Sequence, residues 1–136
     1  MAISPDLELQ GVVFDVLRAD PEMISLVNGR IYDRVPENKV FPYVSFGPTD
    51  DFEDDADCIY GTDLTIQLDV WSREVGFPEA KRICNAARNA LHDKDLQLTE
   101  NALVQIACRG IRMLRDPDGL TSHGIVEINA FIERQP

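Results

Sequence analysis

The chain has 136 residues, 44% of them hydrophobic and 27% charged, and is expected to fold as a single domain covering residues 1–136. Its 24 acidic residues outnumber the 13 Lys and Arg, and the formal net charge of -11 argues against a nucleic-acid-binding protein or one that binds an anionic membrane. No signal peptide is expected, and no apolar stretch is long enough to predict a membrane span.

The first half of the chain begins with a predicted helix. Ser4-Pro5 is a helix start, and apolar residues then recur at helical spacing until Asp20-Pro21. A short helical turn is predicted over residues 22–27. A short strand at 30–35, a loop at 36–39 and a strand at 41–47 that Pro48 breaks should follow.

An acidic loop is predicted at residues 50–57. Its six carboxylates are Asp50, Asp51, Glu53, Asp54, Asp55 and Asp57. A solvated loop is the simplest interpretation. The functional alternatives are a surface for a basic partner or one that repels DNA phosphate. A calcium loop would include a turn glycine and a closing bidentate glutamate, and this segment has neither, so no metal ligands are assigned.

The second half of the chain combines strong strand and helix patterns. Residues 58–73 alternate apolar and polar side chains, as in an antiparallel strand with one buried face. Gly76-Phe77-Pro78 precedes the main helix, whose core stripe includes Ile83 and Leu91. The class is therefore α+β, with a mostly antiparallel sheet, two helices on one face and a long C-terminal β-hairpin.

The C-terminal hairpin runs from Leu103 to about Arg115, turns at residues 116–119 and returns to Arg134. Val104, Ile106 and Cys108 are predicted to face the core, and Gly110 to mark a bulge. Arms of about a dozen residues are roughly 40 Å long, so the hairpin should span the domain or project beyond it. Long arms of this kind favour contact with another subunit.

Three arginines lie on the outgoing arm of this hairpin: Arg109, Arg112 and Arg115. They can pair with Glu127 and Glu133 across the strands, or with an acidic patch on the next subunit. Trp71 is a second candidate for a subunit contact, unless it only fills a face of the sheet.

No catalytic motif is present in the sequence. His92 is interpreted as a residue at the end of the main helix and His123 as a solvated turn residue. The three cysteines, Cys58, Cys84 and Cys108, are interpreted as buried free thiols in a reducing compartment. The chain is therefore predicted not to be an enzyme, and no cofactor or metal is assigned.

Three segments together resemble a known family. They are residues 29–36 with 41–47 (GRIYDRVP and FPYVSFG), residues 67–73 (QLDVWSR) and residues 112–119 (RMLRDPDG). In this order, and with the flanking helices, the chain is similar over residues 7–133 to the tail completion, or tail terminator, proteins of long-tailed phages. The same component occurs in phage-derived gene transfer agents.

The resemblance implies a structural, non-enzymatic virion subunit that is assembled in the host cytoplasm. It implies a homo-oligomer, a hexameric ring that caps the tail tube, ends its polymerisation and joins the tail to the neck. The expected partners are the tail tube protein and a neck or stopper protein, while DNA passes through the channel without specific binding. The acidic loop would then face the channel or the adjoining tube protein.

Three alternatives stay open at this point. The first is another neck component, such as a head-completion or stopper protein. The second is a metal-binding module built on residues 50–57, as a small enzyme or a binding domain. The third is an acidic DNA mimic, which would explain the charge but not the long hairpin.

Overall fold

A computed structural model describes residues 3–135 of the protein. Its elements in chain order are α1 (Pro5–Ala19), α2 (Pro21–Val27), β1 (Ile31–Tyr32), β2 (Tyr43–Glu53), β3 (Gly61–Ser72), α3 (Pro78–Leu91), β4 (Ala102–Arg115) and β5 (Ser122–Glu133). The strands form one sheet in the order β1-β2-β3-β5-β4, and only the β1–β2 pair is parallel. The α+β class with a mostly antiparallel sheet is thus confirmed.

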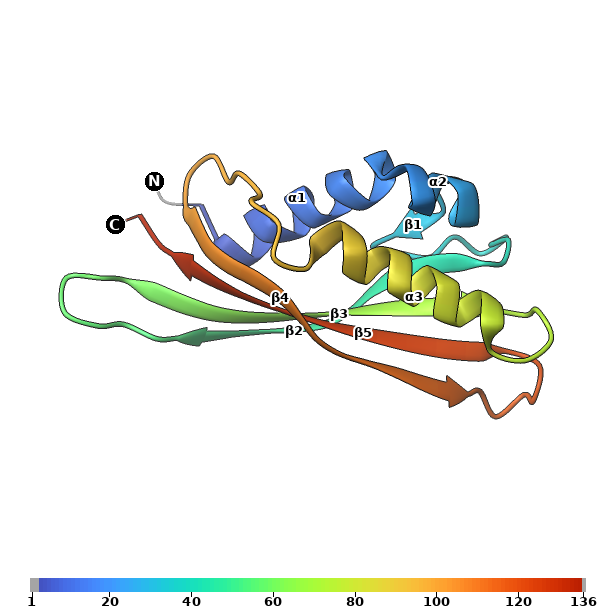
Figure 1. Cartoon of the computed structure of the whole chain (residues 1–136). Coiled ribbons are helices and arrows are strands. Elements are labelled where there is room, and N and C mark those ends of the chain that lie inside the picture. The colour runs from blue at the N-terminus through green and yellow to red at the C-terminus, as the bar shows by residue number, and fades with distance from the viewer. Residues whose placement is uncertain (1–2, 136) are drawn as a thin grey trace.

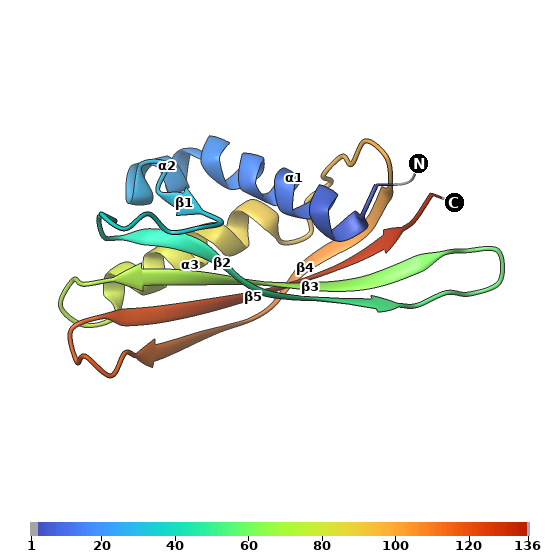
Figure 2. The ribbon, with the colours of Figure 1, turned by 180° about the vertical axis from the view of Figure 1, so that it is seen from behind.

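The three helices all lie on one side of the sheet, so the other face is open (Figures 1 and 2). The prediction counted two helices and a helical turn, and that turn is the short helix α2. Local capping explains where the helices begin. Ser4 Oγ accepts from the backbone N–H of Leu7, and a carboxylate oxygen of Asp20 accepts from that of Met23.

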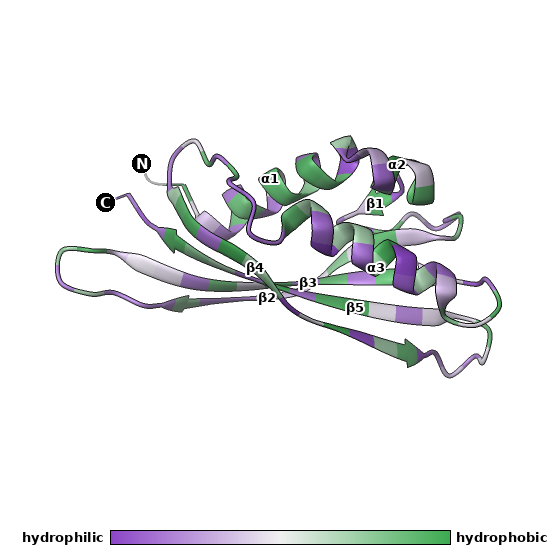
Figure 3. Ribbon diagram, in the orientation of Figure 1, coloured by the Kyte–Doolittle hydropathy of each residue, from purple (hydrophilic) through white to green (hydrophobic). Residues whose placement is uncertain are grey.

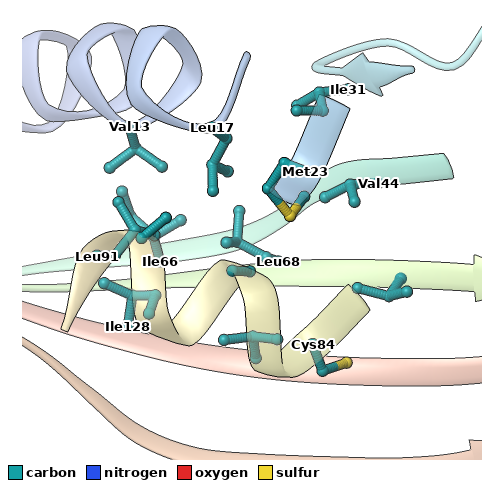
Figure 4. Close-up of a cluster of buried hydrophobic side chains, with 14 of the residues drawn as sticks. Val13, Leu17, Met23, Ile31, Val44, Ile66, Leu68, Cys84, Leu91 and Ile128 are labelled. Carbon is teal, nitrogen blue, oxygen red and sulfur yellow. The ribbon is translucent and has the colours of Figure 1, made fainter. Parts of the chain in front are cut away.

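The hydrophobic core fills the space between this helical layer and the sheet. The predicted stripe of α3 is buried, as is every second residue of β3 from Leu64 to Val70. Figure 4 shows Leu17 of α1, Leu91 of α3 and Ile66 of β3 pointing into the same layer. Figure 3 shows hydrophobic and hydrophilic residues mixed along the strands, and in β3 it is the hydrophobic ones from Leu64 to Val70 that are buried.

β2 is longer than the sequence predicted, and the acidic segment is not one loop. The strand continues through Pro48, where its register with β3 shifts between Phe46 and Thr49. Asp50, Asp51 and Glu53 are strand residues paired with β3, and only Asp54, Asp55 and Asp57 lie in the connection. A bulge accommodates the proline. This part of β2 extends beyond β1 and pairs only with β3, so the proline interrupts no hydrogen bonds to a second strand.

The hairpin that projects from the domain is β2–β3. Its outer part, residues 50–65, is called the arm below: the base of the arm, at 61–65, pairs with β5, and its tip extends past the helices in both views (Figures 1 and 2). The β4–β5 hairpin instead spans the domain, and α3 contacts both of its strands. Of the two possibilities predicted for the C-terminal hairpin, spanning the domain is the one observed.

β4 is an edge strand with two irregularities. Its register with β5 shifts between Leu103 and Gln105 and again between Cys108 and Gly110. The first shift turns Val104 outward, where it is 59% exposed, so its predicted place in the core was wrong. The second makes Arg109 the extra residue, which confirms a bulge beside Gly110.

Candidate interaction surfaces

The arm combines negative charge with exposed apolar side chains. Phe52, Ile59 and Tyr60 are 66%, 43% and 52% exposed, respectively. Large apolar side chains exposed on a projecting hairpin are more typical of a contact surface than of a solvated loop. The sequence analysis missed them, although Phe52 stands between two acidic residues and Tyr60 closes the segment.

The carboxylates of the arm fall into two groups. Asp51 accepts a hydrogen bond from Thr62 Oγ1, while Glu53 and Asp55 lie 3.8 and 2.5 Å from the guanidinium of Arg134. Asp50, Asp54 and Asp57 form no ion pair with any residue from 3 to 135. Asp51 has a neutral partner, so within residues 3–135 four of the six negative charges at 50–57 remain for solvent or a partner.

The arm is anchored to the last residues of the chain. The backbone N–H of Arg134 donates to the carbonyl of Tyr60 at 2.6 Å. A Cβ on Gly61 would lie 2.5 Å from the Asp54 carbonyl oxygen and would also overlap the Phe131 ring. This close packing, together with the pairing of residues 61–65 with β5, holds the arm in a defined position.

The carboxylates of the arm do not converge. Over residues 3–135, no three His, Cys, Asp or Glu side chains gather in a way that could hold a metal ion. Three of the six acidic residues at 50–57 lie on β2. Successive side chains of a strand point to opposite faces, so Asp50 lies on one face and Asp51 and Glu53 on the other, which separates their charges.

The three arginines of β4 do not pair with Glu127 or Glu133 anywhere in the described chain. Arg109 Nη2 lies 3.4 Å from Asn129 Oδ1, and the Arg115 guanidinium lies 4.6 Å from the centre of the Phe77 ring. Arg112 is exposed. The structure therefore contradicts the pairing within the subunit, and their predicted role at a subunit contact stays a prediction.

A hollow of about 310 Å³ lies beside Arg112 on the open face of the sheet. A Cβ placed on Gly110 would meet no atom within 4 Å, so this glycine leaves space. Residues of β3, β4 and β5 line the hollow: Gln67, Gly110, Ile111, Arg112, Ile125 and Glu127. Of the three arginines, Arg112 thus borders a recess with both apolar and polar walls.

A second hollow, also of about 310 Å³, lies between α1 and β2. Its apolar walls include Leu7, Phe14 and Phe46, and its rim carries Asp15 and Asp33. This recess has acidic rather than basic neighbours, so it does not complement the arm.

Trp71 lies in a row of stacked rings on the open face. Its ring is 6.4 Å from that of Tyr43 and 3.9 Å from that of His123, and its Nε1 donates to Ser45 Oγ. His123 Nε2 lies 2.6 Å from Asp69 Oδ1, so the prediction of a solvated turn residue was wrong. Trp71 fills the face of the sheet here, and its part in a subunit contact stays a prediction.

The thiols differ in environment. Cys84 is buried, Cys108 is half-buried, and Cys58 is exposed at the tip of the arm, which contradicts its predicted burial. Desolvation, with a smaller effect of the neighbouring Cys108, raises the pKa of Cys84 to about 12. His92, at the end of α3, accepts a hydrogen bond from the backbone N–H of Cys108 through Nδ1.

Comparison with known proteins identifies related chains. Residues 11–133 match the family model described as "Tail completion protein gp17". A chain of the solved structure "Virion of native gene transfer agent (GTA) particle" is 27% identical, with a TM-score of 0.89 over 97% of this chain and 99% of that one. No curated protein matches. No helix within residues 3–135 is long and apolar enough to cross a membrane.

These comparisons confirm the resemblance drawn from the sequence. They also confirm the structural, virion-associated class that it implied, since the family is a tail component and the neighbour is part of a virion particle. The predicted range of the resemblance, residues 7–133, closely matches the range of the family model.

Proposed function

Because the chain belongs to the tail completion protein gp17 family, we propose that it is the tail terminator of a phage or gene transfer agent. In this role, copies of the chain form a ring on the end of the finished tail tube. The family resemblance described above implies a ring of six copies. The ring ends polymerisation of the tube and joins it to the neck. Its partners are the tube protein and a neck or stopper protein.

The observation that supports this proposal most strongly is the full-length likeness to one chain of a gene transfer agent virion. Two chains that cover 97% and 99% of each other share a complete fold and not merely a common motif. The chain also has a projecting arm, which gives it a surface for contact outside its own core. The net charge of -11 suits a conduit through which DNA slides without binding.

Two surfaces have roles in this proposal. The acidic residues at 50–57 face a partner or the channel. The arginines of β4 and Trp71 contribute to contacts between subunits. The exposure of the arm supports the first assignment, and the absence of acidic partners for these arginines within residues 3–135 supports their part in the second.

The test is binding of the purified protein to isolated particle parts. Tail tubes and filled heads are incubated separately with the protein and examined by electron microscopy. We expect a cap on one end of the tubes, and tubes that no longer grow when tube protein is added. Attachment to filled heads with no attachment to tubes would contradict the proposal and would indicate another neck protein.

A further inference from the structure

We propose that the acidic arm of each subunit docks on the arginine-bearing strand β4 of a second copy of this chain. The contact places the apolar tip of the arm at the hollow beside Gly110. This inference rests on the proposed ring and names the surfaces that close it.

The arm supplies one half of a complementary pair. At its tip, Phe52, Ile59 and Tyr60 are exposed next to the unpaired carboxylates of Asp54 and Asp57. Water solvates carboxylates well but not these rings and branched chains, so burial of the tip is favourable. A matching surface needs a recess with some apolar wall and with cations beside it.

Strand β4 supplies that surface. The hollow of about 310 Å³ has Gly110 and Ile125 among its lining residues and Arg112 on its border, with Arg109 in the adjacent bulge. One carboxylate, that of Glu127, also lines it. On a chain with 24 acidic residues and only 13 Lys and Arg, Arg109 and Arg112 place two positive charges on the open face of one edge strand, while Arg115 lies against Phe77 on the helix side.

The geometry favours contact through side chains rather than strand addition. The two register shifts of β4 interrupt its ladder with β5 and disturb the regularity of its free edge. Bulges of this kind protect an edge strand from pairing with another strand. Arginine forks can still reach carboxylates on a partner, because they bind such groups bidentately.

The arm and the β4 surface are different parts of the same chain, separated along the sheet (Figure 1). A contact between two different surfaces is heterologous, and its repetition produces a ring or a filament rather than a two-fold dimer. One chain carries both halves of this contact, so a ring of this kind needs no other protein to join its subunits. We therefore take a second copy, and not the tube protein, as the occupant of the hollow.

Cysteine cross-linking in assembled particles tests the contact, since Cys58 is already at the tip of the arm. A Cys108→Ser background removes the half-buried thiol near the hollow. Arg112→Cys is then added, and particles are treated with a short bismaleimide. Lys39→Cys, on the loop between β1 and β2, is the matched control. Chains are separated by denaturing electrophoresis, and the same particles are examined for tail length and head joining.

We expect a ladder of linked copies with Arg112→Cys. The ladder should be absent with Lys39→Cys and should disappear when Cys58→Ser is added. Particles with normal joined tails but no ladder would overturn the docking proposal and leave the proposed function standing. If the protein is absent from tails, the proposed function itself fails.

A second variant fills the hollow without disturbing the subunit. Gly110→Val places its Cβ where no atom lies within 4 Å, and the Cβ of Gly11→Ala on α1 likewise meets no atom within 4 Å. We expect Gly110→Val to lose ring assembly while keeping its melting temperature, and Gly11→Ala to assemble normally. Assembly of Gly110→Val at wild-type levels would contradict the proposal.

Discussion

The Nε2 atom of His123 lies 2.6 Å from Oδ1 of Asp69, and the His123 ring stacks on that of Trp71 at 3.9 Å between centroids. These residues connect β3 and β5 on the face that the helices leave open. Asp69 is nearly buried and also accepts from Gln67 Nε2 at 2.9 Å. A buried carboxylate needs such partners, so the histidine stabilises the sheet away from the main core.

Exchange of His123 for Phe should lower the free energy of unfolding by about 1–3 kcal/mol, because Asp69 loses a hydrogen bond while the ring stack is retained. His123→Ala loses both and should destabilise more. Urea unfolding followed by the fluorescence of Trp71, the only tryptophan, measures each change. In combination with Asp69→Asn, the His123→Phe effect should be smaller than when it is made alone. Simple additivity of the two changes would contradict this account.

Glu8 should make the fold sensitive to acid. Its carboxylate accepts from the backbone N–H groups of Thr99, Glu100 and Asn101 at 2.7–3.0 Å, which fixes the loop before β4. Desolvation raises the pKa of Glu8, but these hydrogen bonds outweigh it and lower the pKa below 4.5. A lowered folded-state pKa means that this stabilisation is complete above 4.5 and is lost as the pH falls toward the folded value.

Glu8→Gln should therefore lower the unfolding free energy by about 1–3 kcal/mol at neutral pH, since an amide cannot accept at both atoms. The difference between variant and wild type should shrink below pH 4.5. Urea titrations at several pH values measure it, with Glu22→Gln on the exposed side of α2 as the control. A difference that stays constant down to pH 2 would show that the charge of Glu8 contributes nothing.

Gly124 is required by the packing of β5 against α3. A Cβ at this position would lie 2.5 Å from Cys84 Sγ and 3.2 Å from Met113 Cε. Gly124→Ala should cost about 1–3 kcal/mol of stability through overpacking. Cys84→Ala removes the clashing sulfur, so we expect the double variant to be more stable than Gly124→Ala alone. Thermal unfolding of the three variants measures this, and failure of the second change to compensate would place the strain elsewhere.

Two of the three thiols, Cys58 and Cys84, should react in a fixed order. Cys58 is exposed, whereas burial raises the pKa of Cys84 to about 12, so almost none of it is thiolate near neutral pH. Iodoacetamide at pH 8, followed by mass spectrometry, should modify Cys58 first and Cys84 only after urea is added. Labelling of Cys84 in the folded protein at a rate close to that of Cys58 would contradict the observed packing.

The elements with a strong local pattern were predictable from the sequence. For β3 and for α3, only one orientation of the element buries its apolar residues. A shift of β3 by one residue, for example, would turn all of its apolar side chains to the solvent. Pro48 misled the prediction for β2, since a bulge accommodates it at a part of the strand that β1 does not cover. The length of the arm therefore went unrecognised.

The roles of individual polar residues depended on pairing between distant strands. His123 follows a turn in the sequence, but the β3–β5 register places it opposite Trp71 and beside Asp69. The β4–β5 register places Arg112 opposite Ile125, at the border of a hollow, and places Ala102 rather than Arg112 opposite Glu133. Local sequence carries the propensity of each strand, whereas contacts across strands follow from the assembled sheet.

Electron microscopy of particles produced with and without this protein tests the central claim most directly. If the protein terminates the tail, particles lacking it should have tails of uncontrolled length or tails that never join heads. Supplying the protein in trans should restore tails of one length attached to heads. Tails of normal length joined to heads in the absence of the protein would contradict its role as a terminator.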